Sequence, residues 1–135
     1  MMGIDIHERV RDALSAAGIR DVTAGRITAA TAQDGVVVRL MPTVTTARYM
    51  DGSRRCDCYF QVIAKGRRSD GAEAPADVCE RAIGVLRDAT LESANGSFSL
   101  VSRPEPDGDV EELAVGGDRT YVFAVKFVCK IIRKG

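Results

Sequence analysis

The sequence contains very little histidine. Among its 135 residues there is only His7, which falls in the first turn of an expected helix. Ser-His-Asp and Cys-His catalytic arrangements use a histidine as the base, so any such scheme would depend on this residue alone. A histidine at such a position is usually exposed to solvent. We therefore expect no catalytic residues and a protein that is not an enzyme.

Motifs that bind phosphates or metals are also lacking. The chain has no Gly-x-Gly-x-x-Gly or Walker pattern, and Gly116-Gly117 indicates a hairpin turn. Cys56 and Cys58 have no second closely spaced pair of ligands, as a zinc knuckle would need. The acids between Glu105 and Glu112 do not fit the calcium loop of an EF-hand. We expect no cofactor-binding residues and no metal ligands.

Long apolar runs are missing as well. No stretch approaches the roughly 18 apolar residues that cross a bilayer. Residues 1–5 lack the basic start and apolar core of a signal peptide. We expect no membrane contact and synthesis in a reducing cytoplasm. The four cysteines are then small buried hydrophobic side chains rather than disulfide partners: Cys56, Cys58, Cys79 and Cys129.

The chain has no net charge, but its charges are segregated. Nineteen basic and nineteen acidic residues cancel, so the whole chain does not attract nucleic acid. Residues 43–68 carry six basic and two acidic residues, residues 69–118 three basic and twelve acidic, and residues 119–135 five basic and no acidic. Two interpretations stay open. Acidic and basic blocks meet between copies in a head-to-tail ring, or they neutralise each other within one subunit.

Two amphipathic helices are expected. Apolar residues recur at helical spacing from Ile6 to Ala17, and Asp5 with Glu8 forms a box-like capping pair at the start. The second helix begins near Pro75, whose missing amide proton costs nothing in a first turn. Its buried stripe runs from Val78 to Leu86.

Two long alternating segments predict half-buried strands. Residues 55–65 place Cys56, Phe60 and Val62 on one face, and residues 119–133 place Tyr121 and Phe127 on one face in the same way. Shorter strands are expected at residues 36–41, 97–103 and 110–115. Residues 42–51 and 104–109 are expected to be connections, and weak periodicity indicates a short strand near residues 26–30.

This order of elements predicts the fold class. Strands segregated from helices favour an α+β fold, with a mostly antiparallel sheet of about four to five strands and two helices packed on one face. The length and a hydrophobic content of 45% suit one domain over residues 1–135.

With these elements in place, the chain resembles the phage tail terminator family, the minor capsid or head-tail joining proteins of long-tailed phages. The resemblance covers most of the chain and depends on the order and spacing of four features: the first helix, the Tyr49–Ser53 lead into the aromatic strand Tyr59–Val62, the helix Ala76–Ala89, and a closing strand that starts at Tyr121.

The resemblance implies a role in virion assembly without chemistry. It implies a ring of six copies of this chain that caps the tail tube, contacts the tail tube protein and the head connector protein, and stops tail polymerisation. DNA would pass through the channel without sequence-specific binding. The protein would be located at the head-tail junction of the virion after assembly in the host cytoplasm.

Charge suggests which residues meet partners in such a ring. The loops Pro42–Arg54 and Gly66–Ala74 would contact the tube or neighbouring subunits. The expected partner-binding residues are three arginines and four opposing acids: Arg54, Arg67, Arg68, Glu105, Asp107, Glu111 and Glu112.

Two other functions remain as alternatives. One is a small-ligand-binding or lyase-type α+β domain, with a pocket between the Cys56–Phe60 face and the Val78–Leu86 stripe. These faces are apolar and offer no converging polar groups, which favours a filled core. The other is a different head-tail neck protein, such as a head completion or adaptor protein, although adaptors tend to be helical.

Overall fold

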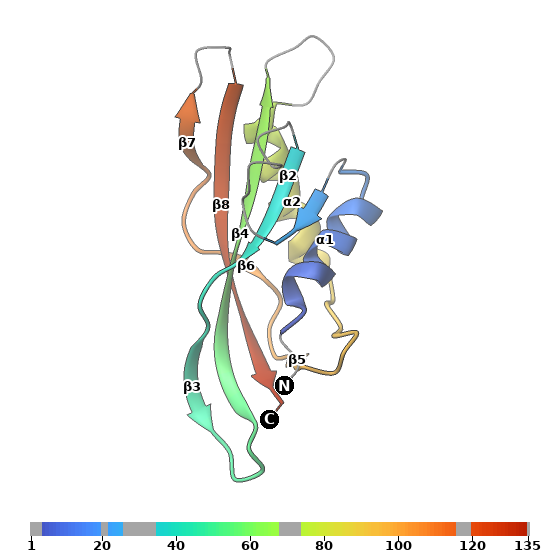
Figure 1. The fold of residues 1–135 in the computed structure, drawn as a ribbon, viewed down its shortest axis with the longest axis vertical. Coiled ribbons are helices and arrows are strands. Elements are labelled where there is room, and N and C mark those ends of the chain that lie inside the picture. Colours follow the sequence, from blue (N-terminus) through green and yellow to red (C-terminus); the bar gives the residue numbers. More distant parts are fainter. Residues whose placement is uncertain (1–3, 20–21, 26–34, 68–73, 116–119, 135) are drawn as a thin grey trace.

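The structure is a computed structural model that describes residues 4–19, 22–25, 35–67, 74–115 and 120–134 (Figure 1). Its elements follow in this order: α1 (Ile6–Ala16), β1 (Val22–Ala24), β2 (Gly35–Leu40), β3 (Val44–Arg48), β4 (Arg54–Arg67), α2 (Pro75–Asp88), β5 (Phe98–Leu100), β6 (Glu105–Pro106), β7 (Glu111–Val115) and β8 (Thr120–Arg133).

A ribbon of two long strands organises the sheet. β4 and β8, fourteen residues each, pair antiparallel from the Arg54–Arg133 row to the Arg67–Thr120 row. β3 and then β2 pair along the outer edge of β4. β7, β6 and β5 pair in turn along β8. β1 adds to β2 in parallel, so the predicted α+β class with a mostly antiparallel sheet is confirmed.

The predicted number of strands is wrong. The described sheet has eight strands, not four to five. The three that the sequence did not reveal are β1, β3 and β6, which have three, five and two residues. Alternation with a period of two gives little signal over so few residues. β6 also contains Pro106, which a sheet tolerates at its edge. The strand expected near residues 26–30 lies outside the described residues.

Both helices cover one face of the sheet (Figure 1). The inward-facing residues of β4 and β8 form one buried cluster with the stripes of α1 and α2. At its centre the rings of Phe60 and Phe127 stack with centroids 5.1 Å apart. The helix stripes that pack against this face are as the sequence predicted: Ile6, Val10 and Leu14 on α1, and Cys79, Ala82 and Leu86 on α2.

The expected capping pair at the start of α1 does not form. Asp5 occupies the N-cap position, but its side chain makes no capping hydrogen bond. Its backbone amide instead donates to the Ser97 hydroxyl at 3.4 Å, so Glu8 does not accept from it. The Asp5 carboxylate faces residues 93–97 and accepts hydrogen bonds from this segment instead of from the amides of the helix.

Candidate functional site

The histidine is less exposed than the sequence suggested. His7 is half-buried on α1, and its Nδ1 atom is buried without a hydrogen-bond partner among the described residues. A catalytic histidine needs a second group that fixes its tautomer and orientation. The described residues supply none at this atom.

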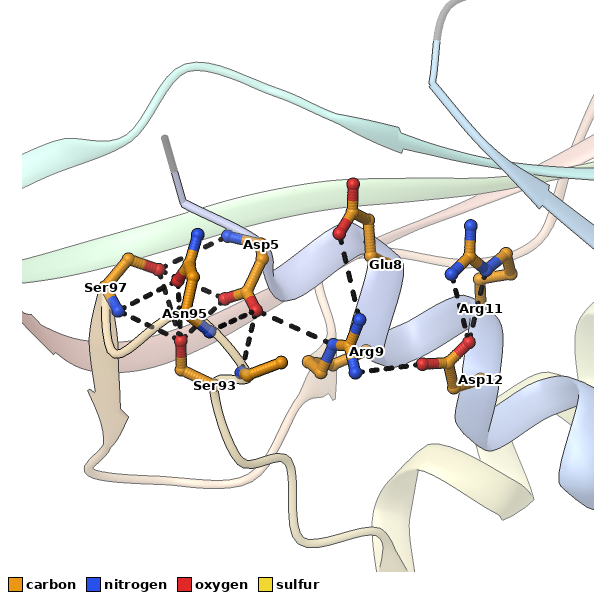
Figure 2. Close-up of polar contacts among 9 residues, drawn as sticks. Asp5, Glu8, Arg9, Arg11, Asp12, Ser93, Asn95 and Ser97 are labelled. Atoms are coloured by element: carbon orange, nitrogen blue, oxygen red, sulfur yellow. Dashed lines mark hydrogen bonds and ion pairs between the residues drawn. The ribbon is translucent and has the colours of Figure 1, made fainter. Parts of the chain in front are cut away.

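A polar cluster joins the start of α1 to residues 93–97 (Figure 2). The Asp5 side chain at its centre is only 5% exposed. Its carboxylate accepts four hydrogen bonds from the facing segment: from the hydroxyls of Ser93 at 2.7 Å and Ser97 at 3.1 Å, and from the amides of Ala94 at 2.8 Å and Asn95 at 3.3 Å. Arg9 lies on the opposite side, with Nε 3.7 Å from the same carboxylate.

These contacts give the cluster a structural role. Burial alone would raise the pKa of Asp5, but the hydrogen bonds from Ser93, Ala94, Ser97 and Asn95 together hold the pKa below its ordinary value. The carboxylate is therefore ionised at neutral pH with its oxygens occupied by donors. We call this cluster the Asp5 latch, since it fastens α1 to the segment before β5.

The cysteines lie inside the protein, as predicted. All four are buried and free. Cys58 faces Cys129 across the central ribbon, and Cys56 points to the same face. Within the described residues, no group of three histidine, cysteine, aspartate or glutamate side chains is placed to hold a metal ion.

We predict that no thiol of the folded protein reacts readily. Burial raises the pKa of Cys79 to about 11. The hydrogen bond between Cys58 and Cys129 raises the pKa of Cys129, together with burial, and lowers the pKa of Cys58. Cys58 is nevertheless fully buried, so a reagent has no access to it in the folded protein. The reactive species is the thiolate, so an aromatic disulfide reagent at pH 7.5 should label the native protein very slowly and all four thiols in denaturant. Rapid native labelling, or faster labelling after a chelator removes zinc, would contradict this.

The predicted acidic residues gather along β6 and β7. Glu105 lies in β6, and Glu111 and Glu112 lie exposed in β7. Asp107 forms an ion pair with Lys126 of β8 at 3.3 Å, so the acidic and basic blocks neutralise each other within the subunit at this point. Glu105, Glu111 and Glu112 form no ion pair with any described residue.

The predicted basic residues do not share one site. Arg54 starts β4 and Arg67 ends it, so they lie at opposite ends of the long ribbon. The side chain of Arg67, and Arg68 as a whole, lie outside the described residues. Arg54 stands in a cross-strand row between Arg48 of β3 and Arg133 of β8. Like charges directly opposite one another are unfavourable, and none of these three arginines has an ion-pair partner among the described residues.

This arginine row lies next to the turn of a hairpin, in a segment that the sequence analysis expected to be a connection. β3, the turn and the first residues of β4 form an arm, residues 44–57, which extends below the helices in Figure 1. The turn is tightly built. Tyr49 N donates to Ser53 O at 2.9 Å, Ser53 N donates to Asp51 Oδ1 at 2.9 Å, and Gly52 has a φ of 88°. Its tip carries Met50, which is fully exposed.

The sequence contained a signal for this arm. The β-branched residues after Pro42 and the Asp51-Gly52 dipeptide are typical of a hairpin. The run Val44-Thr45-Thr46-Ala47 is too polar to stand out by hydrophobic alternation.

The space proposed for a ligand in the alternative reading is filled by side chains. Phe60, Cys79, Ala82 and Leu86 from the two facing surfaces are all fully buried in one cluster. This packing favours a solid core at the interface between the sheet and α2.

No helix among the described residues is long and apolar enough to cross a bilayer.

Comparisons with known proteins give a structural match and no match by sequence. The chain matches no protein family model and no curated protein. Its structure is similar to that of a chain in the virion of a native gene transfer agent particle, with a TM-score of 0.59 and 15% sequence identity over 94% of each chain. At this identity the likeness concerns the fold, and the fold of this chain is that of a chain found in a virion.

Proposed function

We propose that this protein is a non-enzymatic structural component of a phage-type virion, and more specifically a tail terminator. In this role a ring of six copies caps the tail tube, stops its growth and joins it to the head connector. DNA passes through the ring without sequence-specific contacts.

The main support is the likeness in fold to a chain of a gene transfer agent virion, which extends over nearly the whole of both chains. A match of 94% in each direction leaves little of either chain without a counterpart. Because the identity is only 15%, the likeness supports a virion component, and the terminator role depends on the resemblance in element order as well.

The surroundings of the candidate catalytic side chains support a role without chemistry. The Asp5 carboxylate is occupied by four donors. The cysteines are buried, and the described surroundings of His7 supply no partner for Nδ1. The described sheet edge also carries exposed acids, Glu105 in β6 and Glu111 and Glu112 in β7, where a neighbouring subunit or a tube has access.

Deleting the gene from the genome that encodes it tests the proposal. We expect particles without the protein to show tails of uncontrolled length and no joining of heads to tails, and a plasmid copy to restore both. Electron microscopy of negatively stained lysates measures tail length and joining directly.

The outcomes separate the alternatives. Tails of normal length with unjoined heads would favour another neck protein over a terminator. Normal, infectious or transfer-competent particles without the protein would overturn the proposal.

A further inference from the structure

Exposed apolar side chains in the described part of the molecule are concentrated on the arm. Large hydrophobic residues that are clearly exposed number five: Val44, Tyr49, Met50, Val101 and Leu113. Three of the five belong to the arm, Leu113 lies in β7, and Val101 directly follows β5. Met50 is 108% exposed at its tip, although the hydrogen-bonded turn holds it in a defined position. Methionine is frequent at protein-binding surfaces, and Met50 together with the exposed Tyr49 gives the end of the arm an apolar contact area.

The fourth residue is exposed by a β-bulge. The register of β7 against β8 shifts between Glu112 and Ala114, so Leu113 has no partner in the ladder and is 48% exposed. Bulges re-aim side chains at sheet edges. Here the bulge places an apolar residue beside Glu111 and Glu112. We call these three residues the acidic strip.

The arm and the acidic strip are complementary. The arm combines Met50 and Tyr49 with the unpaired arginine row, and the strip combines Leu113 with two glutamates that have no described ion-pair partner. An arginine row that is unfavourable in the free subunit gains most from an anionic partner.

The two surfaces cannot meet within one copy. β3 pairs with β4 at its Arg54 end, whereas Glu111 of β7 lies in the row of Ala124 and Ile63. Nine residues of β4 separate these rows, or about 30 Å of strand. Figure 1 shows the arm at one end of the molecule and β7 at the other. A contact between them therefore requires a second copy.

We infer that the arm of one copy docks on the acidic strip of the next, with Arg48 and Arg54 against Glu111 and Glu112 and with Met50 against Leu113. The contact joins two different surfaces, so it propagates head to tail and closes into a ring when the rotation between copies allows. β3 also has a bulge, between Thr45 and Ala47. Because bulges at both edges hinder continuous strand pairing, side chains supply the contact. The inference rests on the proposed ring and assigns its interface.

A charge-exchange experiment tests the inference. One variant carries Arg48→Glu and Arg54→Glu, a second carries Glu111→Lys and Glu112→Lys, and a third carries all four changes. Sedimentation velocity at low salt, up to roughly 1 mM protein, should show association of the wild-type chain. Each two-residue variant should associate at least about a hundredfold more weakly, since two close charge pairs become repulsive.

Complementation gives the decisive result. An equimolar mixture of the two defective variants should associate again, because each reversed surface then meets its opposite. The four-change chain should associate alone for the same reason. Met50→Ser should weaken association by about tenfold through lost apolar contact. Reversal of two exposed charges on α2, Glu80→Lys with Arg87→Glu, is the matched control and should change nothing.

Other results would overturn the inference in distinguishable ways. If the arm and strip variants associate as strongly as the wild-type chain, the interface lies elsewhere. Uncontrolled tail length after deletion of the gene would still support the terminator role in that case. Failure of the mixture to associate, or a wild-type chain that stays monomeric at roughly 1 mM, would reject this contact. Loss of duplex DNA binding by the arm variant, without any association of copies, would assign the arginine row to nucleic acid instead. Circular dichroism must show that each variant is folded.

Discussion

Replacing Asp5 by alanine is expected to lower the free energy of unfolding by about 3 kcal/mol. The substitution removes the acceptor of four hydrogen bonds and leaves the donors of Ser93, Ser97 and two amides in a partly buried site without their partner. Hydrogen bonds to charged groups are stronger than neutral ones, and unsatisfied donors add their desolvation cost. Equilibrium unfolding in urea measures the change.

The matched control is Asp12→Ala on the same helix. Asp12 is exposed and pairs with Arg9 and Arg11 only at the surface. Its loss should cost well under about 1 kcal/mol. Equal effects of the two substitutions would show that the Asp5 latch adds nothing beyond a surface carboxylate.

The pH dependence has a definite sign. Because the pKa of Asp5 is lowered in the folded protein, its contribution is complete above the pKa of the unfolded chain, about 4. It is lost as the pH falls through the lower folded pKa. The stability difference between wild type and Asp5→Ala should therefore be constant from about pH 5 to 8 and shrink below about pH 4. A difference that persists unchanged in acid would contradict the assigned hydrogen bonds.

Replacing Phe60 by alanine is expected to cost about 4 kcal/mol, since its ring is fully buried and stacked on Phe127. The lost volume lies between the sheet and α2, where the ligand-binding alternative would have its pocket. In a packed core the substitution leaves a cavity that the neighbouring side chains fill only partly. In a ligand pocket Phe60 would face empty space, and its removal would cost much less.

Phe60→Leu keeps most of the volume and serves as the control, with an expected cost of less than about 1.5 kcal/mol. A second readout separates core from pocket. Small aromatic probes should bind the Phe60→Ala variant, whose cavity is lined by apolar groups, and not the wild type. Saturable binding to the wild-type protein would support the ligand-binding alternative.

The sequence was informative where patterns are long. β4 and β8 have fourteen residues each and alternate over most of their length, so their positions and buried faces could be predicted. The helices were predicted equally well, because their stripes recur over three or more turns. Strands of two to five residues at the sheet edges contain too few alternations to be distinguished from loops.

Contacts between distant residues were not predictable. Asp5 looked like a helix cap because local spacing fits a capping pair, but its partners lie about ninety residues away, with separations of 88 to 92. Only the register of three strands brings Arg48, Arg54 and Arg133 into one row. The same limit applies to Leu113, whose exposure follows from a bulge that no sequence pattern marked.

The acidic block contains both a residue that is neutralised within the subunit and residues that are not. Antiparallel pairing places part of the acidic block beside the basic β8, and Asp107 is neutralised there by Lys126. Glu111 and Glu112 lie farther along the same edge without such a partner. Neutralisation within the subunit therefore accounts for Asp107, whereas Glu111 and Glu112 stay available for the proposed contact between copies.

The most direct test of the proposed function is to add the purified protein to growing tail tubes of the same particle and image the tube ends by electron cryomicroscopy. The account predicts a ring of six copies at one end of each tube and an arrest of elongation. Tubes that grow at the same rate with or without the protein, and that show no added density at either end, would contradict it.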